Sequence, residues 1–291
     1  MYSNNSSVNL IEAIHHLDTL PAMPVIAQKI LALNLESDEG ERAMLKLIEK
    51  DPQIAAKIIG LANTPLFGAA KRISSVSDAS MLLGITRVKS VTMGIAVMSS
   101  LIRKPAGRLD VQGLWLHSLA IALAMRTIAH AMPRNMRPLD DEIFLAGLLH
   151  DIGFMVLNHL DQKRSDELQL MLATDKVHSS TEIENNLLEL NHCELGAELA
   201  HFWELPEQIV AVLRYHHDPE KVQAEVGQPL VRMVNIAEKT LTAFGIAEHE
   251  GAEISADEWQ SIGIAADKAQ EIIQKIKEQA EETKLAAGNF P

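Results

Sequence analysis

The sequence predicts an all-α protein, built as a multi-helix bundle. Apolar residues recur at helical spacing along nearly all of the 291 residues. Helix start and stop signals separate the apolar stretches, and no convincing alternating pattern of a β-strand is found. Hydrophobic residues make up 47% of the chain and aromatic residues only 4%, so we expect a sizeable core of aliphatic side chains and methionine.

The first part of the chain predicts several short helices. The clearest start signal is Asp51 followed by Pro52, an N-cap residue and a proline at the first helical position. That helix ends near Asn63, because Thr64 precedes Pro65 and a residue before proline avoids the helical region. The predicted helices of this part cover residues 25–33, 52–62, 79–83 and 88–101.

The second part begins after a predicted linker, residues 103–110, which contains a proline and a glycine. The helices predicted beyond it cover residues 114–132, 143–160, 165–173, 183–203, 205–217, 230–244 and 257–285. We therefore expect an N-terminal helical subdomain over residues 1–104, packed on a second helical subdomain over residues 105–250. Residues 251–291 are expected to form a closing helix.

Charge and cysteine content exclude several classes of protein. The formal net charge of −13 disfavours a duplex nucleic-acid partner, which needs a surplus of lysine and arginine. The single cysteine, Cys193, excludes a disulfide within the chain and a thiolate zinc site, and it is expected to be a small buried hydrophobe. Residues 1–9 lack the features of a signal peptide, and the apolar run 91–102 is too short for a membrane span. We expect a soluble cytoplasmic protein without a membrane contact.

The candidate functional residues are histidines and carboxylates placed in or beside apolar helical stretches. They are His117, His150, Asp151, His192, His216, His217 and Glu238. Imidazole and carboxylate together suit iron or manganese, with zinc as a third candidate, and an adjacent His-Asp pair can serve one or two ions. A buried Asp151 must be paired, hydrogen-bonded or bound to metal. His216 and His217 have an alternative role as cations at a helix C-terminus.

The hexapeptide at residues 148–153, Leu-Leu-His-Asp-Ile-Gly, resembles the signature of the HD superfamily of metal-dependent phosphohydrolases. The order His117, then His150 with Asp151, then Glu238 resembles the four-ligand set of that superfamily. The resemblance implies that Asp151 bridges two ions and that His117, His150 and Glu238 complete one coordination sphere.

His192, His216 and His217 resemble the extra ligands of the HD-GYP branch, which cleaves cyclic di-GMP, and would complete the second sphere. The match is closer to the HDOD family, a regulatory relative, and extends over residues 17–244. The segments that carry it are 20–24, 51–52, 61–65, 73–84, 115–118, 150–153, 192–197, 203–206 and 216–217. The second subdomain is therefore expected to be HD-like.

Three departures from the HD-GYP enzymes argue against efficient catalysis. Phe154 stands where those enzymes typically carry a lysine that contacts the substrate phosphate. The Gly-Tyr-Pro element expected after the paired histidines is absent, and Glu238 replaces an aspartate. Positioning carries much of the rate of such chemistry, so these changes favour metal binding over turnover.

Three interpretations of function remain at this stage. The first is a bacterial-type HDOD signal-transduction module that binds metal without efficient turnover. The second is a metal-dependent phosphohydrolase acting on a nucleotide or a cyclic dinucleotide, in which Asp151 would be catalytic. The third is a scaffold whose histidine cluster is metal-free. The length leaves no room for a receiver or cyclase domain, so we expect signalling partners in trans, a nucleotide as candidate ligand, and no indication of oligomeric state.

Overall fold

A computed structural model describes residues 20–102, 107–175, 177–241 and 253–286 of the chain, and these residues form helices and no strand. The all-α multi-helix fold that the sequence predicts is confirmed. The polar segment 1–9 and the first half of the predicted linker, residues 103–106, lie outside the described residues.

The first helices follow their predicted start signals. They are α2 (Val25–Leu31), α3 (Asp38–Glu49), α4 (Pro52–Ala62), the 3₁₀ turn η2 (Pro65–Phe67), α5 (Val76–Leu83) and α6 (Ile85–Leu101). Asp51 Oδ1 accepts from two backbone N–H groups of the first turn of α4, at 3.1 Å each, as its N-cap role predicts. Helix α5 begins earlier than expected because Ser75 is its N-cap. Helix α3 has no counterpart in the prediction.

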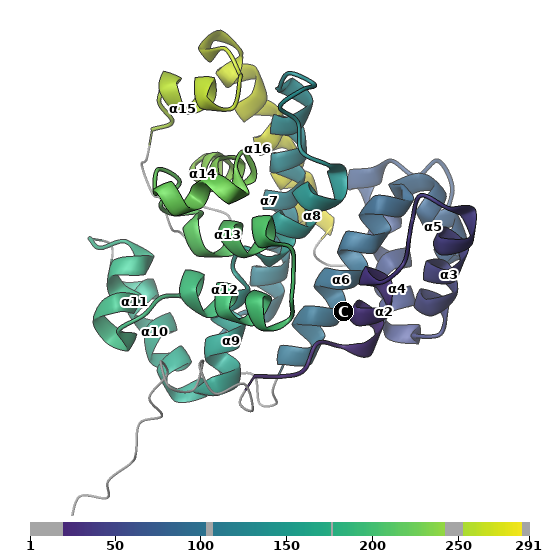
Figure 1. Ribbon diagram of the computed structural model, residues 1–291, viewed down its shortest axis with the longest axis horizontal. Coiled ribbons are helices and arrows are strands. Elements are labelled where there is room, and N and C mark those ends of the chain that lie inside the picture. Colours follow the sequence, from purple (N-terminus) through teal and green to yellow (C-terminus); the bar gives the residue numbers. More distant parts are fainter. Residues whose placement is uncertain (1–19, 103–106, 176, 242–252, 287–291) are drawn as a thin grey trace, which may run out of the picture.

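The remaining elements form the larger part of the bundle. They are α7 (Val111–Ala131), α8 (Asp140–Leu149), α9 (Ile152–Leu160), α10 (Gln162–Thr174), α11 (Ser180–Leu188), α12 (His192–Phe202), α13 (Glu207–Tyr215), η3 (Val222–Gly227), α14 (Leu230–Thr240), α15 (Ala256–Ser261), η4 (Ala266–Lys268) and α16 (Ala269–Ala286). In Figure 1 the purple and blue helices α2–α6 lie on one side and the teal-green to green helices α11–α14 on the other, with α7 and α8 between them. Helix α8 packs against α6 on one side and against α13 and α14 on the other, so it links the two sides.

The predicted continuous helix over residues 143–160 is wrong. Two helices, α8 and α9, cover this range and are bent by 40° relative to each other, with His150 and Asp151 at the break. Asp151 has φ −98° and ψ 11°, outside regular helical values. Neighbouring residues of a continuous helix point about 100° apart. The break instead lets both side chains face one centre.

Two further helices of the prediction are also split. The range 183–203 contains the end of α11 and all of α12, separated at Glu189, which has a φ of 64°. Asn191 and Glu194 form a capping box at the start of α12, a signal that is present in the sequence. The closing helix predicted over 257–285 is α15, η4 and α16, and the chain turns between α15 and η4 at Gly263, with φ 75°.

Contacts between distant motifs join the two sides of the molecule. The indole Nε1 of Trp203, at the end of α12, donates to the carbonyl oxygen of Pro21, which precedes α2, at 2.9 Å. Both predicted subdomain boundaries, at residues 104 and 250, fall within segments outside the described residues, so the division of the chain remains a prediction.

Helix α7 is long and apolar enough to cross a membrane, judged by length and composition. Its 18-residue window has a mean hydropathy of 1.2, and 67% of that window is buried inside the fold. Two bent pairs, α5 with α6 and α8 with α9, also meet the criterion when each pair is taken together. Helix α7 packs here against α8, α14 and α16. The absence of a membrane contact remains a prediction.

Candidate metal centre

The predicted ligand residues come from separate helices and meet at one place. His117 lies in α7, the His150–Asp151 pair at the α8–α9 break, His192 at the first residue of α12, His216 and His217 directly after α13, and Glu238 in α14. The structure therefore brings together every residue that the sequence singled out, in two adjoining groups.

The first group contains His117, His150, Asp151 and Glu238. One ligand atom from each lies within 4.8 Å of the others. Asp151 Oδ2 lies 3.1 Å from His150 Nε2 and 3.4 Å from His117 Nε2, and Glu238 Oε1 lies 3.3 Å from His150 Nε2. All of these residues are buried. Two imidazoles and two carboxylates make a donor set suited to iron, manganese or zinc.

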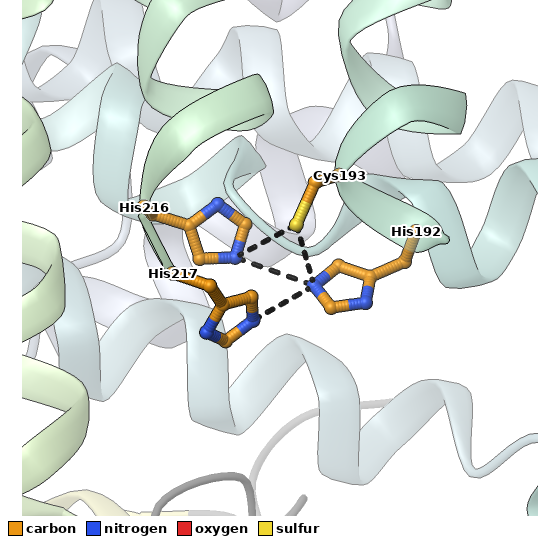
Figure 2. Close-up of side chains that lie close together, drawn as sticks. All are labelled: His192, Cys193, His216 and His217. Carbon is orange, nitrogen blue, oxygen red and sulfur yellow. Dashed lines mark hydrogen bonds between the residues drawn. The ribbon is translucent and has the colours of Figure 1, made fainter. Parts of the chain in front are cut away.

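The second group contains His192, Cys193, His216 and His217. Figure 2 shows the three imidazoles and the thiol pointing towards one another from α12 and the end of α13. His192 Nε2 lies 3.3 Å from His216 Nε2 and 3.2 Å from His217 Nε2. Asp151 Oδ1 faces this group, at 3.5 Å from His192 Nε2 and 3.7 Å from His216 Nε2. Asp151 thus directs one oxygen to each group.

Backbone carbonyl groups orient two of the imidazoles. His150 Nδ1 lies 2.9 Å from the Gly147 carbonyl oxygen, and His216 Nδ1 lies 3.1 Å from those of Val212 and Leu213. A carbonyl oxygen only accepts a hydrogen bond, so Nδ1 carries the proton in each ring. Nε2 of both rings therefore faces the cluster and is the nitrogen that can bind a metal ion once it carries no proton.

Two residues of the centre were missed by the sequence analysis. The buried Glu184 of α11 accepts from the Nδ1–H of His192 and from the backbone N–H of His192, each at 2.8 Å. Nothing in the local sequence distinguishes Glu184 from a surface carboxylate. Cys193 is buried, as expected, yet its Sγ lies 3.5 Å from His192 Nε2. The argument against a thiolate zinc site does not hold, because one thiol can join three imidazoles.

The charges of the cluster are coupled. Burial raises the pKa of the Asp151 carboxyl, but the neighbouring His150, His117 and His192 outweigh burial and hold that pKa well below its usual range. Burial lowers the pKa of His150, but Asp151 and Glu238 outweigh it and raise that pKa well above its ordinary value. Burial, then His217, lower the pKa of His216 well below its ordinary value. Asp151 is therefore ionised and needs positive charge beside it.

The residues fit a bound cation. Both carboxylate oxygens of Asp151 are buried, and the groups that face them are imidazole nitrogens at 3.1–3.7 Å. A buried ionised carboxylate is costly unless it is paired or bound to metal. His150 Nε2 lies 3.1 Å from Asp151 Oδ2, so a metal ion that replaces the proton between these atoms would satisfy both groups.

Phe154 closes one side of the centre. Its side chain is buried, and its ring stacks on His192 with the centroids 4.3 Å apart and the planes 17° apart. The adjacent Gly153 lets α9 approach α12 closely, because an added Cβ would lie 1.9 Å from the His192 carbonyl oxygen. The position at which HD-GYP enzymes typically carry a lysine is thus filled by an apolar ring.

Fold and site together define a class: an all-α protein with a buried imidazole and carboxylate centre assembled from several helices. The family model of the HDOD domain matches residues 20–219, and the chain belongs to the HDOD domain family. The match includes His117, Asp151, His192 and His216, whereas Glu238 lies beyond its end.

Solved structures support this assignment. A candidate signal transduction protein from Marinobacter aquaeolei VT8 is 26% identical, with a TM-score of 0.78 over 97% of this chain and 65% of that chain. An HDOD domain protein of unknown function from Geobacter sulfurreducens is 28% identical, with a TM-score of 0.77 over 96% of this chain and 97% of that chain.

A longer relative was also found. An uncharacterized protein of Treponema pallidum (strain Nichols) is 23% identical over 234 residues, which are 77% of this chain and 42% of that protein. The chain therefore spans less than half of the Treponema protein and about two thirds of the Marinobacter chain.

Proposed function

We propose that this chain is an HDOD-type signal-transduction module that binds one or two divalent metal ions, iron or manganese with zinc as a third candidate, without efficient phosphohydrolase turnover. The observation that carries the proposal is that all seven candidate ligand residues meet at one centre and that their side chains are almost fully buried there. The side chains of His117, His150, Asp151 and Glu238 are at most 2% exposed, and His217 is the most exposed candidate at 9%.

The protein side of the centre holds its donor atoms in place. Glu184 and the backbone carbonyl groups keep the imidazole protons on Nδ1, and Asp151 presents one oxygen to each group. A divalent ion bound there would supply Lewis-acid polarisation of a phosphoryl oxygen. Burial around these residues excludes water and bulky ligands from the side occupied by Phe154.

A cavity of about 630 Å³ reaches the centre at His217. Its wall includes two cations from α14, and both are engaged by carboxylates: Arg232 Nη1 lies 3.0 Å from Glu220 Oε1, and Lys239 pairs with Glu258. A substrate phosphate would have to compete with two carboxylates for this positive charge. Such competition favours binding of metal over binding and turnover of phosphate esters.

An assay of the full chain tests the proposal. We expect purified protein to contain metal by elemental analysis. With added manganese or iron it should hydrolyse cyclic di-GMP far more slowly than the roughly 1 s⁻¹ at the low end of ordinary enzymes. Rapid product release that is lost in Asp151→Asn would overturn the proposal. It would establish the alternative, a metal-dependent phosphohydrolase. The placement of one Asp151 oxygen towards each group favours that alternative, because two-metal hydrolysis needs a bridging carboxylate.

The proposal extends to partner and location. We place the module in the cytoplasm, acting on a signalling protein in trans, with a nucleotide as the candidate ligand suggested by the resemblance to cyclic di-GMP enzymes. The buried single thiol of Cys193 is compatible with a reducing compartment. Calorimetric titration of cyclic di-GMP into the protein tests whether it binds this nucleotide. Binding without hydrolysis supports a sensing role, and the absence of any binding heat rules out cyclic di-GMP as the ligand.

Replacing Phe154 by lysine should not create an enzyme. Phe154→Lys would bury an ammonium group between α9 and α12, and we expect the free energy of unfolding to fall by about 3 kcal/mol. Phe154→Leu is the matched control and should lose less, because the site stays apolar. Denaturant unfolding of both variants, with the cyclic di-GMP assay, measures the effect. A stable Phe154→Lys protein with enzyme-like turnover would show that one missing cation separates this chain from catalysis.

A further inference from the structure

The thiol of Cys193 lies among the imidazoles of the second group, and the metal binding proposed above gives it no role. We propose that Cys193 is a metal ligand and that, with His192, His216 and His217, it makes the second group a three-imidazole, one-thiolate site selective for zinc. This inference rests on the proposed metal binding and specifies its second position. The first group, which offers two carboxylates and no sulfur, would keep the harder iron or manganese ion.

The distances fit a tetrahedral zinc ion. With Zn–N bonds of about 2.05 Å and a Zn–S bond of about 2.3 Å, tetrahedral ligands lie about 3.3 Å apart from nitrogen to nitrogen and about 3.6 Å apart from nitrogen to sulfur. His192 Nε2 lies 3.3 Å and 3.2 Å from the Nε2 atoms of His216 and His217. Cys193 Sγ lies 3.5 Å from His192 Nε2 and 3.9 Å from His216 Nε2. These four separations match four of the six edges of such a tetrahedron within a few tenths of an ångström, and all four ligand atoms lie within 4.8 Å of one another.

The imidazole orientations allow a cation between the rings. Glu184 accepts the proton of His192 Nδ1, and backbone carbonyl groups accept that of His216 Nδ1. The Nε2 atoms of both rings face each other at 3.3 Å, a separation at which they can share a proton or bind a common cation. A zinc ion in place of a shared proton would use both nitrogens as donors.

The thiol is placed where a thiolate is favoured. Cys193 is the second residue of α12, in the first turn, where the helix macrodipole stabilises negative charge. Zinc binding replaces the thiol proton: the S–H bond breaks, the S–Zn bond forms, and one proton leaves to solvent. No oxidant or reductant takes part.

Neighbouring residues that are not ligands themselves hold the His192 ligand in place. Glu184, which is 0% exposed, accepts two hydrogen bonds from His192, one from the backbone N–H and one from Nδ1–H. The Phe154 ring stacks on a face of the His192 imidazole. Outer partners of this kind typically contribute about 10–100-fold to metal affinity. The site is therefore supported by the fold and is not an accidental meeting of side chains.

X-ray absorption at the zinc edge tests the inference. Apo protein is loaded with one equivalent of zinc, and its metal content is measured by elemental analysis. We expect a sulfur neighbour at about 2.3 Å in the wild-type spectrum. Cys193→Ser should lose that neighbour and bind zinc more than about 100-fold more weakly, above the range for the loss of an outer partner. Glu194→Gln is the matched control: it removes a negative charge from the same helix turn, yet its side chain is exposed and should leave zinc binding unchanged.

The outcomes separate the inference from the proposed function. Bound zinc with only nitrogen and oxygen neighbours overturns the role of Cys193 and leaves metal binding by the cluster intact. Protein that takes up no metal overturns both. The wild-type spectrum decides the question even if Cys193→Ser fails to fold.

Discussion

Gly153→Ala should be among the most destabilising substitutions in the chain. The added Cβ would lie 1.9 Å from the carbonyl oxygen and 2.6 Å from the carbonyl carbon of His192, and backbone atoms cannot rotate away. Helix α9 would have to move away from α12. Overpacking of this kind typically costs 1–3 kcal/mol, and two backbone contacts place it at about 3 kcal/mol or more. The free energy of unfolding, measured with denaturant, checks this.

Gly196→Ala is the matched control for that substitution. Gly196 lies on the opposite side of the same helix contact, but its nearest neighbours would be 3.3–3.4 Å from the new Cβ. The gain in helix propensity, about 0.5–1 kcal/mol, should offset most of the crowding. Because the clash at Gly153 involves His192 itself, only Gly153→Ala should also weaken metal binding. Equal stability of the two variants would contradict the close approach of α9 and α12.

Removing metal should lower the stability of the protein by a similar amount. The ligands come from α7, the α8–α9 break, α12, the end of α13 and α14, so a bound ion ties these elements together. An ion present at about 1,000 times its dissociation constant stabilises the folded form by about 4 kcal/mol. For a chain of this size that corresponds to a fall in Tm of roughly 10 °C on chelation. Thermal unfolding with and without chelator measures it.

The control for chelation is Asp151→Asn. Asp151 is the side chain shared by both groups, and its amide replacement keeps the shape while removing the charge. The variant should lose a smaller part of its Tm on chelation than the wild type, because the first group loses its carboxylate charge while the second group keeps its own four side chains. If wild-type protein that demonstrably contains metal keeps its Tm after chelation, the proposed link between metal and fold is wrong.

The positions of helices were predictable where the signals for their start and periodicity lie within a few residues. The cap at Asp51 and the helical periodicity of α7 depend on residues a few positions apart, so the sequence predicts them. The capping box of Asn191 and Glu194 and the glycine of the turn, Gly263, are equally local signals, although the predicted helices run through both places. These errors in helix boundaries arise because the apolar pattern continues across the break between two helices.

The break at His150 and Asp151 is a different case. The flanking residues are apolar on both sides, and local propensity would continue the helix across them. The bend exists because α9 packs closely on α12 through Gly153 and because both polar side chains must face the buried centre. Tertiary packing outweighs propensity here, as it commonly does.

By itself the sequence determined the all-α class, the HDOD resemblance and the residue types of a metal centre, because helical periodicity and motif spacing are properties of neighbouring residues. Only the tertiary structure decided that Glu184 orients His192 and that Cys193 lies among the imidazoles. Only it showed that Phe154 closes the site, with its ring stacked on His192. Such contacts join helices that are distant along the chain. Their distances, which set both coordination and access, follow from how whole helices pack and not from any local run of residues.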